Sequence, residues 1–163
     1  MRIYFKYLWY ILRHKWFVFL ECKKLGFPAL GIIHDWSKFR PSEFFPYARY
    51  FFRDNSEEGL VAIGIYGLAE LAPFGFYTKD HFDIAWFLHQ KRNKHHWQWW
   101  LLPKDDNRTA IFEIPLKYRK EMLADWRGAS RAQGTPDTKK WYLRHKHKML
   151  LGPETRKWIE KNL

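Results

Sequence analysis

The scarcity of β-strand signals is the feature that most constrains the fold of this chain. β-branched residues rarely alternate with polar ones, and no Asn-Gly pair marks a tight hairpin. Hydrophobic residues make up 47% of the 163 residues, which is enough for a substantial core. The sequence therefore predicts an all-α fold, a single-domain bundle of about six to eight helices over residues 1–163.

Helix start and stop signals divide the chain into segments. Gly26 ends the first helix, Ser42 can cap the third, Asp80 can cap a later one, and Pro115 suits a first helical position. Gly152 and the proline after it separate the last short helix from the preceding one. The other helices are expected at about 3–25, 29–38, 42–52, 57–71, 80–100, 115–130 and 136–150.

The N-terminal segments "YLWYIL" and "WFVFL" are strongly apolar, but Arg13, His14 and Lys15 separate them. Neither approaches the roughly 18–20 apolar residues of a membrane span. We expect a buried core helix, with a helix lying on a membrane as the minor alternative. No small-residue cleavage site follows, so a cytoplasmic protein, bacterial or from a phage-infected host, is expected.

Charge and cysteine content narrow the partners and the ligands. The formal net charge of +12 favours anionic partners, namely nucleotides, nucleic acid or a membrane surface. Cys22 is the single cysteine, which excludes an internal disulfide and a zinc ribbon. Any metal must therefore be held by histidines and carboxylates.

The segment "GIIHDWSKF" places His34, Asp35 and Lys38 at the edge of an apolar run. An imidazole and a carboxylate suit a divalent metal, and a nearby ammonium suits the phosphate that such a metal would polarise. On a helix, the three side chains can share one face. The alternative is the polar end of a helix, where a lysine favours the dipole.

The segment "HQKRNKHHWQWW" concentrates histidines. His89, Asn93 and His96 fall at positions i, i+4 and i+7, on one face of a helix, and His95 lies on a neighbouring face. Metal binding is one interpretation. The other is a basic and aromatic surface that binds nucleic acid by stacking and phosphate contacts.

Two further ionisable residues lie in apolar surroundings. Asp125 follows a helical stripe that looks core-facing, and a buried acid needs a metal or a cationic partner such as Arg127 or Arg131. His14 has apolar neighbours along the first helix, where a hydrogen-bonded core histidine is the usual explanation.

The order of these elements resembles the HD-domain superfamily of metal-dependent phosphohydrolases. The "GIIHDWSKF" segment is similar to that family's hydrophobic-HD-x-x-K signature, His14 to its first-helix histidine and Asp125 to its last-helix aspartate. The resemblance covers about residues 10–130, with the helices of 136–163 expected to pack on this core. It implies one or two divalent ions (Mn, Fe, Co, Ni, Zn or Mg) held by His14, His34, Asp35, His89, His95, His96 and Asp125.

The resemblance also implies a function. We expect hydrolysis of a nucleotide or another small phosphate ester by metal-activated water, with Asp35 bridging two metals if two are bound and Lys38 neutralising phosphoryl charge. Arg127 and Arg131 are expected to help bind the anionic substrate. The alternatives are a nucleic-acid-binding protein or a nucleotide-sequestering protein with a non-catalytic HD-like site.

The whole chain also resembles a family of small bacterial and phage proteins that share "HD-x-SK", "H-x-x-x-N-x-HHW" and "EM-x-x-DW" elements. That likeness implies no substrate. No "GYP" follows the histidine pair, so cyclic-di-GMP phosphodiesterase activity is not expected.

Overall fold

The computed structural model describes residues 2–52 and 81–163, and these form an all-α bundle with one short hairpin. The helix expected over 57–71 and the expected cap at Asp80 lie outside the described residues. None of the helices in the described ranges is long and apolar enough to span a membrane.

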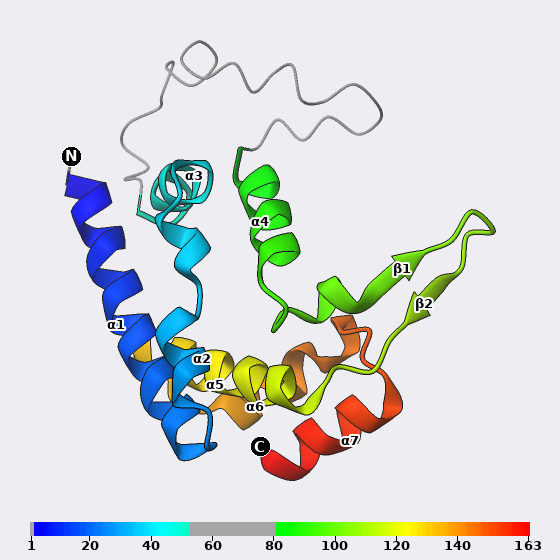
Figure 1. The fold of residues 1–163 in the computed structure, drawn as a ribbon. Helices are drawn as coiled ribbons and strands as arrows, with labels where there is room; N and C mark the ends of the chain where they lie inside the picture. Colours follow the sequence, from blue (N-terminus) through cyan, green and yellow to red (C-terminus); the bar gives the residue numbers. More distant parts are fainter. Residues whose placement is uncertain (1, 53–80) are drawn as a thin grey trace.

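The crossing of α1 (Arg2–Lys24) and α5 (Leu116–Ala132) is the largest helix–helix contact of the bundle. Figure 1 shows α1 along one side and α5 running across the base of the molecule. Gly128 lies at the contact, and a Cβ atom there would come within 2.5 Å of Val18 Cγ2 and 2.9 Å of Val18 N. Only glycine permits this approach, which sets the spacing between the two helices.

Four elements form the other half of the described bundle. They are α2 (Pro28–Ile33), the 3₁₀ helix η1 (Trp36–Phe39), α3 (Pro41–Phe52) and α4 (His81–Arg92). In both views α3 and α4 lie side by side above α5. Their buried Tyr47, Ala48 and Ala85 pack with Tyr7 and Ile11 of α1. This core closes the space between α1 and α4.

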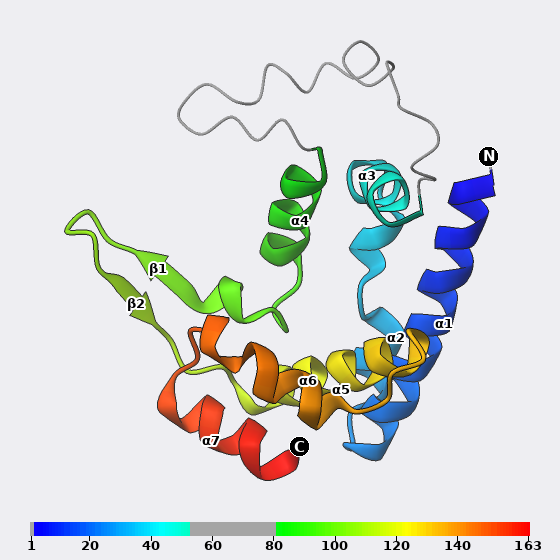
Figure 2. The ribbon, with the colours of Figure 1, turned by 180° about the vertical axis from the view of Figure 1, so that it is seen from behind.

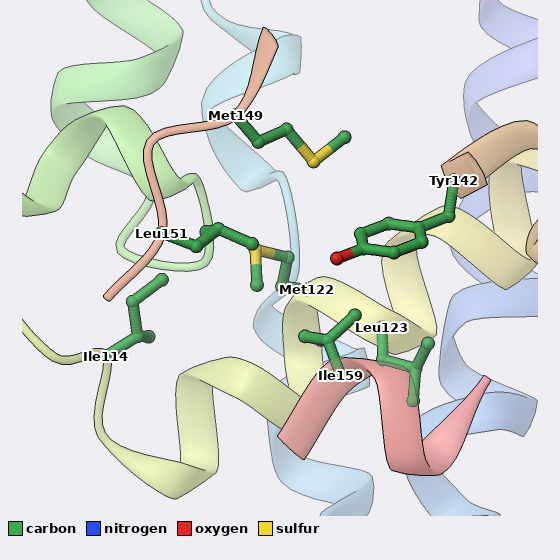
Figure 3. Close-up of a cluster of buried hydrophobic side chains, with 7 residues drawn as sticks. All are labelled: Ile114, Met122, Leu123, Tyr142, Met149, Leu151 and Ile159. Carbon is green, nitrogen blue, oxygen red and sulfur yellow. The ribbon is translucent and has the colours of Figure 1, made fainter. Parts of the chain in front are cut away.

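A second core joins the C-terminal helices to α5. The chain continues through α6 (Thr138–His145), the 3₁₀ helix η4 (Lys146–Lys148) and α7 (Pro153–Asn162). Figure 3 shows Tyr142 of α6 and Ile159 of α7 packed with Met122 and Leu123 of α5. The C-terminal helices therefore complete the apolar side of α5.

The hairpin was not predicted. It consists of β1 (Leu101–Pro103) and β2 (Thr109–Ile111), antiparallel, with Leu101 opposite Ile111. It follows the 3₁₀ helix η3 (Trp97–Trp100) and projects from the bundle in Figure 2. Asn107 takes a positive φ of 63° in the turn, a conformation that asparagine tolerates without a following glycine.

Two predicted helices end earlier than expected, one just before Asp35 and the other just before Asn93. The helix expected over 29–38 ends at Ile33, and Asp35 takes a left-handed φ of 54° before η1 begins. The helix expected over 80–100 ends at Arg92, where the Asn93 side chain donates to the carbonyl oxygen of His89. Asparagine and aspartate side chains compete with helical hydrogen bonds in this way.

We predict that Gly128→Ala destabilises the fold by about 1–3 kcal/mol, although alanine is the better helix former. The added methyl group would collide with Val18 and push α1 from α5. Chemical denaturation measures the change. Lys117→Ala, on the exposed side of the same helix, is the control, and equal stability of the two variants would contradict the prediction.

We predict that Glu113→Gln lowers stability at neutral pH by less than about 1 kcal/mol, because the carboxylate is partly exposed. Glu113 accepts hydrogen bonds from the backbone N–H groups of Glu154 and Thr155 at the start of α7. Burial alone would raise the pKa of Glu113, but these bonds and the Thr155 hydroxyl outweigh it and lower the pKa.

A carboxyl group with a lowered pKa stabilises the fold above its unfolded-state value of roughly 4.3, and the stabilisation is lost as the pH falls through the folded-state pKa. Melting temperatures of wild type and Glu113→Gln should therefore converge between pH 5 and about pH 3. A difference that stays constant over this range would refute this role of Glu113.

Candidate metal centre

The candidate ligands come from five places in the chain and meet between α1, α4 and α5. Each offers an imidazole nitrogen or a carboxylate oxygen, and these atoms form two groups within which all lie within 4.8 Å of one another. The first group contains His14, His34, Asp35 and Asp125, and the second contains Asp35, His89, His95 and His96. All seven residues expected from the sequence are thus brought together.

The first group is built around His34 Nε2. This atom lies 3.3 Å from His14 Nε2, 3.2 Å from Asp35 Oδ2 and 3.3 Å from Asp125 Oδ1. His14 Nε2 lies 3.1 Å from the same oxygen of Asp125. Two imidazole nitrogens and two carboxylate oxygens converging on one point form a donor set that suits a divalent transition metal.

The second group consists of atoms without hydrogen-bond partners. Nε2 of His89, His95 and His96 and Oδ1 of Asp35 are all buried and unpaired. His89 Nε2 and His95 Nε2 lie 3.4 and 3.5 Å from Asp35 Oδ1. Buried polar atoms are rarely left unpaired. Their convergence here fits a metal ion, and three imidazoles favour a transition metal over Mg²⁺.

Asp35 belongs to both groups because its two oxygens diverge. Oδ2 lies beside His34 and Lys38, while Oδ1 lies beside His89 and His95. Adjacent residues on a helix would point about 100° apart. The left-handed backbone of Asp35 breaks the helix instead, so that both His34 and Asp35 enter the same interior space.

Two buried glutamates fix the orientation of the imidazoles. Glu121 Oε1 lies 3.1 Å from His34 Nδ1 and 3.2 Å from His95 Nδ1, and Glu43 Oε2 lies 2.9 Å from His89 Nδ1. A carboxylate on Nδ1 leaves Nε2 free as the ligand atom. Glu43 reaches His89 from the first turn of α3.

Glu121 and Ser37 were missed as members of this network, whereas Asn93 had been placed on one face with His89 and His96. Ser37 Oγ donates to Glu43 at 2.8 Å, and Asn93 Nδ2 donates to Ser37 Oγ at 2.8 Å. The signal for Glu121 was its spacing, since it lies four residues before Asp125 and so on the same face of α5. Ser37 carried no comparable signal, because its position depends on the helix break at Asp35.

The pKa of His34 in the first group shifts in the opposite direction to the pKa values of His89 and His96 in the second group. Burial alone would lower the pKa of His34, but Asp35 and hydrogen bonds to Asp125 and Glu121 outweigh it and raise the pKa. Burial lowers the pKa of His89 and, reinforced by the neighbouring histidines, lowers the pKa of His96. Neutral imidazoles are the form that binds metal, and the lowered pKa of His89 and of His96 favours that form.

Lys38 lies beside the shared carboxylate. Its Nζ donates to Asp35 Oδ2 at 2.6 Å, and the side chain is 15% exposed. Burial opposes a charge on Lys38, but the Asp35 and Asp125 carboxylates outweigh it and raise the pKa of the ammonium group. A fixed positive charge is therefore present next to both groups.

Arg127 and Arg131 do not reach the candidate metal centre. Arg131 Nη1 donates to Glu21 at 2.9 Å, and Arg127 pairs with Glu21 at 3.8 Å and donates to the carbonyl oxygen of Asn162. They lie two and six residues after Asp125, which on a helix places them on the opposite side. Their expected contact with substrate at this centre is not supported by these positions.

A family model described as a family of unknown function, DUF5662, matches residues 4–163. The chain belongs to this family. No curated protein and no solved structure matches the chain. All seven candidate ligands of this DUF5662 member lie within the matched residues, so the site is part of the region that defines the family.

We predict that Glu121→Gln weakens metal binding by about 10- to 100-fold. The neutral amide oxygen accepts from the two imidazoles more weakly than the carboxylate does, so His34 and His95 are held less firmly. Competition with a metal-sensitive dye measures the affinity. Glu154→Gln, an exposed glutamate of α7, is the control, and unchanged affinity in Glu121→Gln would exclude the orienting role.

Proposed function

We propose that this protein is a metal-dependent phosphohydrolase that acts on a nucleotide or another small phosphate ester. The observation that carries the proposal is the pair of ligand groups sharing Asp35, one of them made of buried, unpaired donor atoms. The order of the ligands also resembles the HD-domain superfamily. His14, His34, Asp35 and Asp125 would hold one ion, and His89, His95 and His96 with Asp35 a second.

The bound ions would supply Lewis acidity and a water molecule of lowered pKa. The chain itself supplies the arrangement of charges. Glu121 and Glu43 hold the Nε2 atoms of their histidines toward the ions. Asp125, whose side chain is 14% exposed, is the most open ligand of the first group. A phosphoryl group would therefore approach along the side of α5.

Lys38 supplies the fixed positive charge for the reaction. Its ammonium group can donate to a phosphoryl oxygen while it stays close to Asp35. Preorganised donors of this kind stabilise charge that develops in the transition state. In this proposal Lys38 is a catalytic residue and Asp35 is both a ligand and the partner that holds Lys38 in place.

The net charge of +12 favours one alternative, a nucleic-acid-binding protein with a non-catalytic site. Trp97 and Trp100 of the histidine-rich segment add little to it, because they pack against the core around Met122 and Leu123. Nucleotide sequestration without cleavage is a further alternative. Phosphate release distinguishes both from the proposed hydrolase.

We predict that Asp35→Asn removes bound metal and lowers phosphate-ester hydrolysis by at least about a hundredfold. Asparagine tolerates the left-handed backbone of residue 35, and circular dichroism checks that the variant stays folded without the charge that pairs with Lys38. Elemental analysis of the purified protein and phosphate release with added Mn²⁺ measure the two effects. Asp106→Asn, in the exposed hairpin turn, is the matched control.

The outcomes separate the candidate functions. Wild type without stoichiometric metal, and identical to Asp35→Asn, would remove the basis of the hydrolase proposal. Metal without turnover, together with tight nucleotide binding, would favour sequestration. Nucleic-acid affinity that falls steeply with salt and does not change in Asp35→Asn would favour the binding protein.

A further inference from the structure

A cavity of about 230 Å³ lies directly beside the candidate metal centre. His95, His96 and Asp125 form part of its wall, so a molecule in the cavity is in contact with residues of both ligand groups. We call this space the tryptophan cavity, after the three tryptophans described next. Its volume is below the roughly 300 Å³ at which drug-sized ligand sites begin, so it suits a small organic group.

Aromatic rings form one side of the tryptophan cavity. Trp97, Trp126 and Trp141 line it, with the rings of Trp126 and Trp141 5.4 Å apart at an angle of 54°. Met122 and Met149, which belong to the core in Figure 3, also line the cavity. Tryptophan and methionine surfaces offer stacking and sulfur–aromatic contacts to a planar ring.

Apart from Asp125 and the two histidines of the metal centre, the polar side chains of the tryptophan cavity are neutral. Gln98, Ser130, Gln133 and Thr135 line it, and Oε1 of Gln98 is buried without a hydrogen-bond partner. An amide oxygen in this position can accept from the edge of a heterocycle. A buried acceptor of this kind favours a ligand that donates to it over one that leaves it unpaired.

No lysine or arginine of residues 2–52 and 81–163 lines the tryptophan cavity. The nearest arginines on α5, Arg127 and Arg131, are occupied by Glu21 on another side of the helix. The only charged carboxylate in the wall is Asp125, which repels anions. A second or third phosphoryl group inside the cavity would therefore have no lysine or arginine to pair it, and unpaired buried charge is costly.

We propose that the tryptophan cavity binds the neutral, planar organic group of a phosphomonoester, as in a nucleoside monophosphate, and that the site selects monophosphates over di- and triphosphates. This inference rests on the proposed function, because it places the single phosphoryl group at the metal centre beside Lys38. It adds what the ligand groups do not determine: the size, charge and shape of the substrate.

The first experiment compares ligands on the full, Mn²⁺-loaded chain. Adenosine and uridine mono- and triphosphates are tested for phosphate release, and their non-hydrolysable phosphonate analogues are titrated by calorimetry. We expect the monophosphate analogues to bind at least about tenfold more tightly than the triphosphate analogues. Glycerol phosphate, which lacks a ring, serves as the reference ester.

Two variants test the cavity itself. Trp141→Ala should raise KM for a nucleoside monophosphate about tenfold and leave KM for glycerol phosphate unchanged, because it removes only a stacking surface. Gln133→Lys places a cation at the cavity and should shift the selectivity toward the triphosphate. Gln90→Lys adds the same charge on α4, outside the cavity lining, and should not.

The outcomes separate this inference from the proposed function. Triphosphates that bind more tightly and are hydrolysed faster would overturn the inference and leave the hydrolase intact. Selective binding of monophosphate analogues without hydrolysis of any ester would support the inference and remove the hydrolase. If neither analogue binds, or if Trp141→Ala affects both ester classes equally, the cavity does not hold the substrate.

Discussion

The buried negative charge of Asp35 is the constraint on which the rest of the structure depends. The residue is 1% exposed, and its carboxylate has a pKa well below its usual value because His34, Lys38 and His89 outweigh the cost of burial. An unpaired charge at such a depth would be strongly destabilising. The chain therefore surrounds one carboxylate with cationic and imidazole groups from α1, η1, α4 and the loop after α4, and the packing of these elements follows.

Much of this arrangement can be predicted from the sequence. The features that the prediction missed have physical causes. The order of His14, His34-Asp35 and Asp125 predicted one cluster through its resemblance to the HD-domain superfamily, and each of these residues could be placed on or beside an apolar helix. The breaks at Asp35 and Asn93 were missed because residue patterns extend helices across them, while side-chain hydrogen bonds and a left-handed residue end them. Helical periodicity, applied strictly to α5, would have included Glu121 and excluded Arg127 and Arg131.

The tryptophan cavity shows how one helix serves two purposes. On α5, Glu121 and Asp125 face the ligand groups, while Met122 and Trp126 are among the residues that line the cavity. Successive residues of a helix point about 100° apart, so the ionic and apolar faces adjoin along one edge. If the proposed substrate binds here, the bond between its phosphoryl group and its organic group would lie at the edge between these two faces of α5.

The position of Glu121 has a consequence for how the binding of one ion would affect the binding of the other. One oxygen of this carboxylate contacts an imidazole from each ligand group, His34 and His95. An ion that fixes either imidazole restrains the carboxylate, and through it the other imidazole. The two binding steps are then thermodynamically linked, and by reciprocity each site changes the affinity of the other by the same factor. A metal titration of this protein should therefore deviate from the curve of two independent sites.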